Sequence, residues 1–415
     1  MKKSTIGIIA VAVVVVAAVG VYTFTKSGGS SGKTEIEYYS FSANPDYEKQ
    51  LNEMVADFEK EHKDIKVNVQ LAPFDTYLTK IQTLLAGGKA PDVFELNYEN
   101  FVSYANKGVL MDLSSYVKDD KDIDLDNVNK EAFEAYKLDG KQYGMTESFS
   151  NVVTIYNKDM FDAAGVAYPT NEWKWADETA AAEKLTNASK SIWGTYSPVT
   201  MNEFYKVAAQ NGGAIYDKNG KLDINSEKNV AALQHMVDLV LKDKVSPTPA
   251  QLSGQESGDL FVNGQLAMVH TGIWMFESFK KANFNWDIAV EAGNTQKATH
   301  FFANGLVVSK DTKKADASYE FVKFMSISKE EAEIRVNNSW ELPILTDKTV
   351  LKSYLSQTPP SDREVVFESL DYLVMPPVSS IYNKLSTAAD AEFQKVLLGD
   401  ETPKAALDKL QKEFK

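Results

Sequence analysis

The residue types that usually carry catalysis or bind a catalytic metal are present, but their spacing fits neither role. The four histidines, His62, His235, His270 and His300, are scattered, and none belongs to a His-Glu-x-x-His zinc motif. No Gly-x-Ser-x-Gly nucleophile elbow occurs. The chain has no cysteine, which excludes disulfides, thiolate nucleophiles and thiolate metal sites. We therefore expect no catalytic residue, no metal site and no cofactor.

Two other segments come close to ion-binding motifs. Gly87-Gly88-Lys89 lacks the upstream glycine of a phosphate-binding loop, and Ala90 stands in place of its Ser or Thr. An acidic run in residues 120–131 places carboxylates at ligand positions of the helix-loop-helix calcium pattern, but Leu125 replaces the glycine that its sharp turn needs. We interpret this run as a solvated acidic loop.

The elements that must position any site begin after residue 33. Short apolar runs at residues 36–41, 65–71 and 91–96 predict strands, and helical spacing of apolar residues predicts a helix after each one. This β-α-β-α-β-α order is typical of an α/β lobe with a mainly parallel sheet.

A second region opens near Gly144. It contains an apolar run at residues 152–156, a hairpin turn at Asn219-Gly220, and helical patterns that continue to the C-terminus. The apolar run at residues 301–308 predicts a strand that could return to the first lobe. A chain of 415 residues is long enough for two such lobes.

The N-terminus predicts a membrane-associated leader. Lys2 and Lys3 precede an apolar stretch at residues 6–24, which is long for a signal peptide and sufficient to span a bilayer. The positive-inside rule places the rest of the chain outside the cell. We expect residues 1–26 to remain as an anchor, with cleavage after Gly20 as an alternative, and residues 27–33 to form a Gly/Ser tether.

The composition and net charge of the chain limit the kinds of molecule that we expect it to bind. Hydrophobic residues make up 44% of the chain and charged residues 25%, as in an ordered soluble protein. The formal net charge is -14, which disfavours binding to nucleic acid.

Several motifs together carry a family resemblance. The chain resembles family 1 extracellular solute-binding proteins, the sugar-binding components of bacterial ABC-type importers such as maltose- and oligosaccharide-binding proteins. The similarity extends over nearly all of residues 33–415. The motifs occur in order as LAGGKAPDV (85–93), YANKG (104–108), IYNKDMF (155–161), AGV (164–166), FVNGQLAM (261–268), GIW (272–274), GLVVSK (305–310) and ASYEF (317–321). One departure is Val21, which stands where the family's lipidated cysteine would be.

The resemblance implies a two-lobed periplasmic-binding-protein-like fold of type II, with hinge-connected lobes that close on ligand. We expect a first lobe of residues 34–143 and 302–325, and a second of residues 144–301 and 326–415. The implied function is capture of a carbohydrate, with delivery to a membrane permease, by a monomer at the outer face of the cytoplasmic membrane of a Gram-positive-type cell. No enzymatic activity is implied.

Sugars need aromatic platforms and polar groups that hydrogen-bond without reacting. The resemblance points to Trp274 as a ring-stacking residue and to Tyr382 as a sugar-facing aromatic, while Trp340 lies in a polar loop. Trp193 and Tyr196 border a turn at Gly194 and could form a second platform. For each of these, packing in the core remains the alternative.

Polar candidates follow the predicted strands, where open α/β sheets bind ligands. They are Ser42, Asn44, Asn97, Tyr98, Glu99, Glu147, Ser148, Ser150, Asn151 and Asn304. Capping of a nearby helix is the alternative role for each asparagine or serine.

Two other functions stay open at this point. A secreted carbohydrate-active enzyme would use two of the many carboxylates as acid and base or nucleophile. A surface sugar sensor or adhesin would use the same fold without a transporter.

Overall fold

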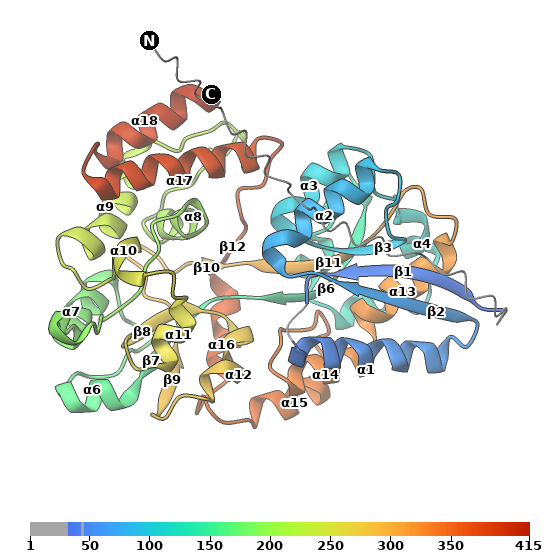
Figure 1. Ribbon diagram of the computed structural model, residues 1–415, viewed down its shortest axis with the longest axis horizontal. Coiled ribbons are helices and arrows are strands. Elements are labelled where there is room, and N and C mark those ends of the chain that lie inside the picture. Colours follow the sequence, from blue (N-terminus) through green and yellow to red (C-terminus); the bar gives the residue numbers. More distant parts are fainter. Residues whose placement is uncertain (1–31, 43–44) are drawn as a thin grey trace, which may run out of the picture.

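Alternating strands and helices open the described part of the chain and build the lobe on the right of Figure 1. The computed structural model describes residues 32–42 and 45–415. Strands β1 (Thr34–Ser40), β2 (Ile65–Leu71) and β3 (Val93–Asn97) pair in parallel in the order β2-β1-β3. Helices α1 (Pro45–Glu61), α2 (Phe74–Ala86) and α3 (Tyr98–Asn106) follow these strands in turn. The predicted β-α-β-α-β-α order is confirmed.

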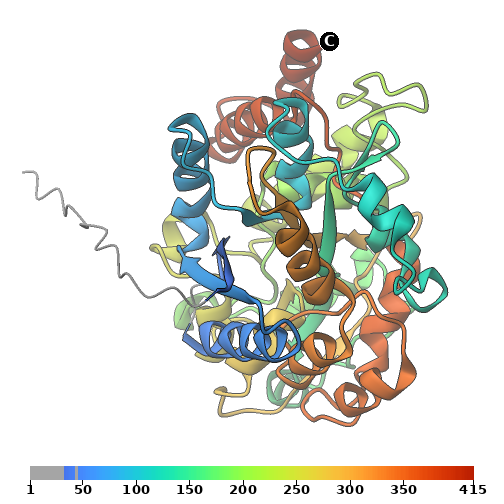
Figure 2. The ribbon, with the colours of Figure 1, turned by 90° about the vertical axis from the view of Figure 1, so that its right-hand side faces the viewer.

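Two further strands complete this sheet, and one of them runs opposite to the other four. β11 (Phe302–Val308) pairs antiparallel with β3, and β6 (Gly144–Ser150) pairs antiparallel with β11. Helix α13 (Ala315–Ile327) covers them, as Figure 2 shows for the orange helix in front of the sheet. The expectation of mainly parallel sheets is therefore corrected to a mixed sheet, because β11, which returns from the other lobe, is antiparallel to both of its neighbours.

The second lobe is built around an antiparallel sheet with the order β8-β7-β9. Its strands are β7 (Val153–Asn157), β8 (Met268–Thr271) and β9 (Trp286–Ala289). Its helices are α6 (Lys158–Ala164), α7 (Trp175–Leu185), α8 (Met201–Gln210), α9 (Glu227–Leu241), α10 (Pro249–Leu252), α11 (Ser257–Val262), α12 (Phe276–Phe279), α17 (Tyr382–Leu398) and α18 (Pro403–Phe414). Figure 1 places this lobe on the left, with α17 and α18 at its top.

The remaining elements lie near the junction or at the edges of the lobes. They are α4 (Ser114–Asp119), α5 (Lys130–Glu134), β4 (Lys137–Leu138), β5 (Lys141–Gln142), β10 (Thr299–His300), α14 (Lys329–Asn337), α15 (Lys348–Leu355), α16 (Glu364–Ser369) and β12 (Leu373–Val374). Helix α14 packs on α1 and α13, and α16 packs on β7. The chain thus stays with the first sheet beyond residue 326, where we expected the second lobe to resume, and enters the second lobe later.

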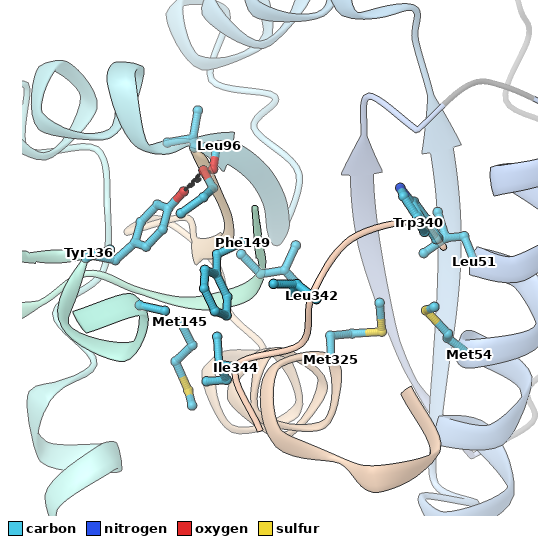
Figure 3. Close-up of a cluster of buried hydrophobic side chains, with 14 of the residues drawn as sticks. Leu51, Met54, Leu96, Tyr136, Met145, Phe149, Met325, Trp340, Leu342 and Ile344 are labelled. Carbon is cyan, nitrogen blue, oxygen red and sulfur yellow. Dashed lines mark hydrogen bonds between the residues drawn. The ribbon is translucent and has the colours of Figure 1, made fainter. Parts of the chain in front are cut away.

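Buried apolar side chains pack around the first sheet and form the core of the first lobe, as Figure 3 shows. Phe149 of β6 and Leu342 exchange backbone hydrogen bonds of 2.9 and 3.0 Å, which fixes the segment after α14 against the sheet. The ring of Tyr136 packs beside Gly305, where an added Cβ would lie only 2.5 Å from the ring. Its hydroxyl donates to the carbonyls of Leu96 and Ala303. These contacts fix β3, β6 and β11 relative to one another, so that the side chains at the ends of these strands have defined positions.

The predicted anchor, most of the predicted tether and the candidate Asn44 lie outside the described residues. Within residues 32–42 and 45–415, none of the helices combines the length and the apolar character needed to cross a bilayer.

Candidate functional site

A cleft of about 810 Å³ lies between the two lobes. This volume falls within the range of roughly 300–1,000 Å³ that is typical of small-molecule sites. The first lobe contributes side chains from the ends of β1, β3 and β11 and from α1 and α3. The second lobe contributes Asn202, Trp274 and one end of α17. A ligand in this cleft would contact both lobes.

Aromatic side chains form much of the cleft wall. They are Phe41, Tyr47, Phe74, Trp274, Phe302, Trp340 and Tyr382. Trp274 lies in a short 3-10 helix (Ile273–Met275) directly after β8, because Gly272 ends that strand. Rings of this kind can cover the apolar faces of a ligand while their edges stay near water.

Two neighbouring side chains, Tyr47 and Arg335, hold the ring of Trp340 in place. The ring of Tyr47 lies parallel to it, with centroids 4.6 Å apart and an interplanar angle of 2°. The guanidinium of Arg335 lies 4.6 Å from its centroid, a cation–π contact. Trp340 is only 6% exposed, so it presents a small part of its surface to the cleft.

The base of the cleft carries buried polar groups that are already hydrogen-bonded. Glu95 accepts from the Ser40 hydroxyl at 2.6 Å and from the Phe41 backbone N–H at 3.1 Å. Glu341 accepts from the Ser148 hydroxyl and from the Asn304 amide at 3.0 Å. These bonds fix both carboxyl groups, so that they present a defined polar surface.

A buried arginine connects this base to the helix behind it. Arg335 of α14 donates to Glu147 of β6 at 2.9 Å and also pairs with Glu331 one turn earlier. All three side chains are at least 96% buried. Because Arg335 also contacts Trp340, this ion pair positions an aromatic of the cleft.

Burial shifts the pKa of several carboxyl groups at the cleft. Burial raises the pKa of Glu99 to about 7, although the Asn97 amide donates to it at 2.9 Å. Burial and the nearby Glu147 carboxylate raise the pKa of Glu95 well above its usual range, which favours its protonated form. Burial likewise raises the pKa of Glu341. The cleft therefore carries less negative charge than its carboxyl count suggests.

A second buried ionic network lies in the second lobe, next to helix α8. Lys206 pairs with Glu203 at 2.7 Å and with Glu291 at 2.5 Å, and His270 pairs with Glu291 at 3.2 Å and with Glu178 at 2.9 Å. Despite burial, which opposes it, the two carboxylates raise the pKa of His270 to about 10. The network supports α8, whose Asn202 lines the cleft.

The cleft brings together about half of the residues predicted from sequence. Those that line it are Ser42, Asn97, Glu99, Trp274, Asn304, Trp340 and Tyr382.

The other predicted residues whose placement is described lie outside the cleft lining. Glu147 is turned toward Arg335, and Ser150 is buried in β6, where its hydroxyl donates to the Asn151 carbonyl. Tyr98 packs edge to face on Phe301. Trp193 is buried in the core, and Tyr196 packs against that core.

Ser148 and Asn151, also polar candidates, act within the protein. The Ser148 hydroxyl donates to Glu341, and the Asn151 amide donates to the Val366 carbonyl at 2.7 Å.

Sequence reasoning missed several residues of the lining. They are Phe41, Tyr47, Phe74, Glu95, Asn100, Asn202, Phe302, Ala303, Arg335, Glu341, Asn383, Ser386 and Thr387. One signal was available for Glu95, because a carboxylate within the apolar run Val93-Phe94-Glu95-Leu96 needs a special partner. Tyr47 gave no such signal, since its spacing also fits the buried stripe of α1.

Most of the acidic run of residues 120–131 is exposed, as expected of a solvated loop, and its first residue is bound by α13. Asp120 pairs with Lys323 at 3.0 Å and accepts from the Tyr319 hydroxyl at 3.0 Å.

Comparison with known proteins gives a consistent result. The family model described as "Bacterial extracellular solute-binding protein" matches residues 44–331. The chain is 59% identical to an ABC substrate-binding protein from Listeria monocytogenes in complex with cycloalternan, with a TM-score of 0.88 and coverage of 92% of this chain and 98% of that one. It is 27% identical to the arabinooligosaccharide-binding protein of Bacillus subtilis, over 80% of this chain and 78% of that protein. A maltose-bound MalE3 from T. maritima, 19% identical, has the same fold, with a TM-score of 0.78 and coverage of 92% and 98%.

Proposed function

This chain belongs to the bacterial extracellular solute-binding protein family, and from that membership we propose that its inter-lobe cleft captures a compact oligosaccharide of the cycloalternan type. The observation that carries this proposal is the cleft itself. It is about 810 Å³ in volume, it lies between two lobes, and its lining combines aromatic rings with fixed polar groups. The 59% identity to the protein whose structure is in complex with cycloalternan supports the choice of sugar.

The chemistry of the lining suits this ligand. Trp274 and Phe302 can cover the apolar faces of sugar rings, and the amides of Asn97 and Asn304 can bond to hydroxyls. Together with Ser42, Glu99, Trp340 and Tyr382, these residues are our proposed ligand contacts.

The protein acts by binding and not by reaction. Glu95 and Glu341, which a glycosidase could use as its pair of carboxyl groups, are both engaged by hydroxyl or amide donors of the protein. Ligand contacts to both lobes favour the closed form, so binding shifts the population toward closure. The closed monomer then docks on a membrane permease of an ABC importer, and the apolar residues 6–24 anchor it at the outer face of the membrane.

Calorimetric titration with cycloalternan, followed by chromatography of the sugar after long incubation, tests this function. We expect saturable one-to-one binding and recovery of intact cycloalternan. Steady cleavage would show an enzyme, and lack of binding at saturating sugar would reject the ligand assignment. A matched titration with arabinooligosaccharides checks the alternative suggested by the Bacillus subtilis relative.

A further inference from the structure

One end of the cleft is closed by a contact between residues that are far apart in the sequence. The hydroxyl of Tyr47, in the first turn of α1, donates to the backbone carbonyl of Trp274 at 2.9 Å. Figure 1 shows the N-terminal end of α1 facing α12, the helix that directly follows the Trp274 segment. This hydrogen bond therefore joins the first lobe to the second at the rim of the cleft.

A second pocket lies directly beyond this contact. Its volume is about 310 Å³, and it shares Tyr47 and Trp274 with the cleft. Its other lining residues come from α1, from α12 and from the segment after α14, among them Gln50, Glu277 and Asn338. Tyr47 and Trp274 thus form a common wall between two cavities.

The two sides of this wall differ in character. The cleft side is rich in aromatic rings, whereas the second pocket is lined mostly by polar and charged side chains, including Lys49, Glu53 and Lys281. A hydroxyl-rich sugar unit could be solvated or hydrogen-bonded there if the wall were removed. The second pocket could therefore hold further units of an extended sugar, but the Tyr47 side chain separates it from the cleft.

The position of Tyr47 is fixed by more than its hydroxyl. Its ring is parallel to that of Trp340 at 4.6 Å, so the side chain cannot swing aside without losing this stacking. At the opposite rim, the contact between the lobes is looser. There the Asn383 amide reaches the Asn100 side-chain oxygen at 3.5 Å, and both residues are partly open to solvent.

We propose that Tyr47 is a specificity-determining residue that walls off the cleft and rejects oligosaccharides extended beyond it at this end. The inference rests on the proposed oligosaccharide ligand and adds to it a limit on ligand length. A compact or cyclic sugar fits within the cleft, whereas a linear chain that runs toward α12 meets the Tyr47 ring.

Two variants distinguish the role of the Tyr47 ring from the role of its hydroxyl. Tyr47→Ala removes the wall and should join the two cavities. Tyr47→Phe keeps the ring that stacks on Trp340 and removes the hydroxyl that donates to the Trp274 carbonyl. Phe74→Ala is the control, because Phe74 lines the cleft without lining the second pocket.

The probes are cycloalternan and linear oligosaccharides with the same glycosidic linkages, titrated calorimetrically against each protein. Tyr47→Ala should shift the ratio of affinities toward the long linear sugar by about tenfold or more. Tyr47→Phe should weaken both ligands by about two- to tenfold, the worth of one net hydrogen bond, and keep their ratio. Phe74→Ala should also leave the ratio unchanged.

An unchanged affinity ratio in Tyr47→Ala, with cycloalternan still bound, would overturn the length limit alone. An unchanged affinity for both sugars in Tyr47→Phe would overturn the role of the bond between the lobes. Should Tyr47→Ala fail to fold, Tyr47→Leu removes the ring in its place, and an unchanged affinity ratio in that variant would overturn the length limit. If the wild-type protein binds none of these sugars, the proposed function and this inference both fail.

Discussion

The rings of Trp274 and Phe302 meet edge to face in the cleft wall, with centroids 5.7 Å apart and an interplanar angle of 70°. Trp274 follows a strand of the second sheet, and Phe302 begins the strand that returns to the first sheet. The pair therefore forms a continuous aromatic surface across the junction of the lobes.

Replacement of Trp274 tests whether this surface binds sugar. Trp274→Ala should weaken binding of cycloalternan by roughly 1–3 kcal/mol, because stacking and burial of the ring are lost. Trp193→Phe is the matched control, since Trp193 is buried outside the cleft lining, and it should leave the dissociation constant unchanged. Equal dissociation constants for Trp274→Ala and wild type would remove Trp274 from the site.

Replacement of Arg335 tests the ion pair behind the cleft. Arg335→Met leaves the buried Glu147 and Glu331 without their shared cation, so it should lower the free energy of unfolding by about 3–5 kcal/mol in urea titrations. The double variant Glu147→Gln/Arg335→Met should recover part of this loss because one unpaired charge is gone. A single variant as stable as wild type would contradict this account.

The raised pKa of Glu99 predicts a dependence of stability on pH. The pKa of about 7 in the folded state exceeds the ordinary glutamate value, so the folded protein binds more protons than the unfolded chain in this interval. The contribution of Glu99 to stability must therefore fall as the pH rises from about 4.5 to 7. Glu99→Gln removes this dependence, and its stability relative to wild type should increase from pH 5 to pH 8. A difference that stays constant over this interval, measured by urea unfolding, would refute the shift.

The Lys206 network offers a comparison between buried and exposed ion pairs. Lys206→Met leaves the carboxylates of Glu203 and Glu291 without their shared cation. It should therefore lower the free energy of unfolding by about 3–5 kcal/mol. Lys395→Met removes a partner of Glu392 near the surface and should cost at most about 1 kcal/mol. Similar losses in the two variants would show that burial does not govern the strength of the Lys206 pair.

Much of the fold could be predicted from the sequence because its signals are local. The apolar strands and amphipathic helices of the first lobe are visible in residues 36–108, and the order of the family motifs predicted the two lobes. The antiparallel pairing of β11 with β3 and β6 was not predicted, because it depends on how the chain crosses between lobes and not on any local pattern.

Part of the site was predictable because side chains at the ends of strands meet at one edge of a sheet, and because the family resemblance pointed to Trp274 and Tyr382. Asn97, Trp274 and Asn304 follow or occupy such strands, and all three line the cleft. Glu147 was also expected to line the cleft, but its buried carboxylate pairs with Arg335 instead. This partner lies 188 residues further along the chain, so no local pattern indicates it. Tyr47 shares the helical spacing of the core residues of α1, yet it lies at the edge of the core, where its ring stacks on Trp340 and lines the cleft.

The crystal structure of the protein with cycloalternan tests the central claim most directly. We expect the sugar between the lobes, in contact with Trp274 and within hydrogen-bonding distance of the Asn304 or Asn97 side chain. Sugar bound elsewhere on the protein, with the inter-lobe cleft empty at saturating ligand, would contradict the account.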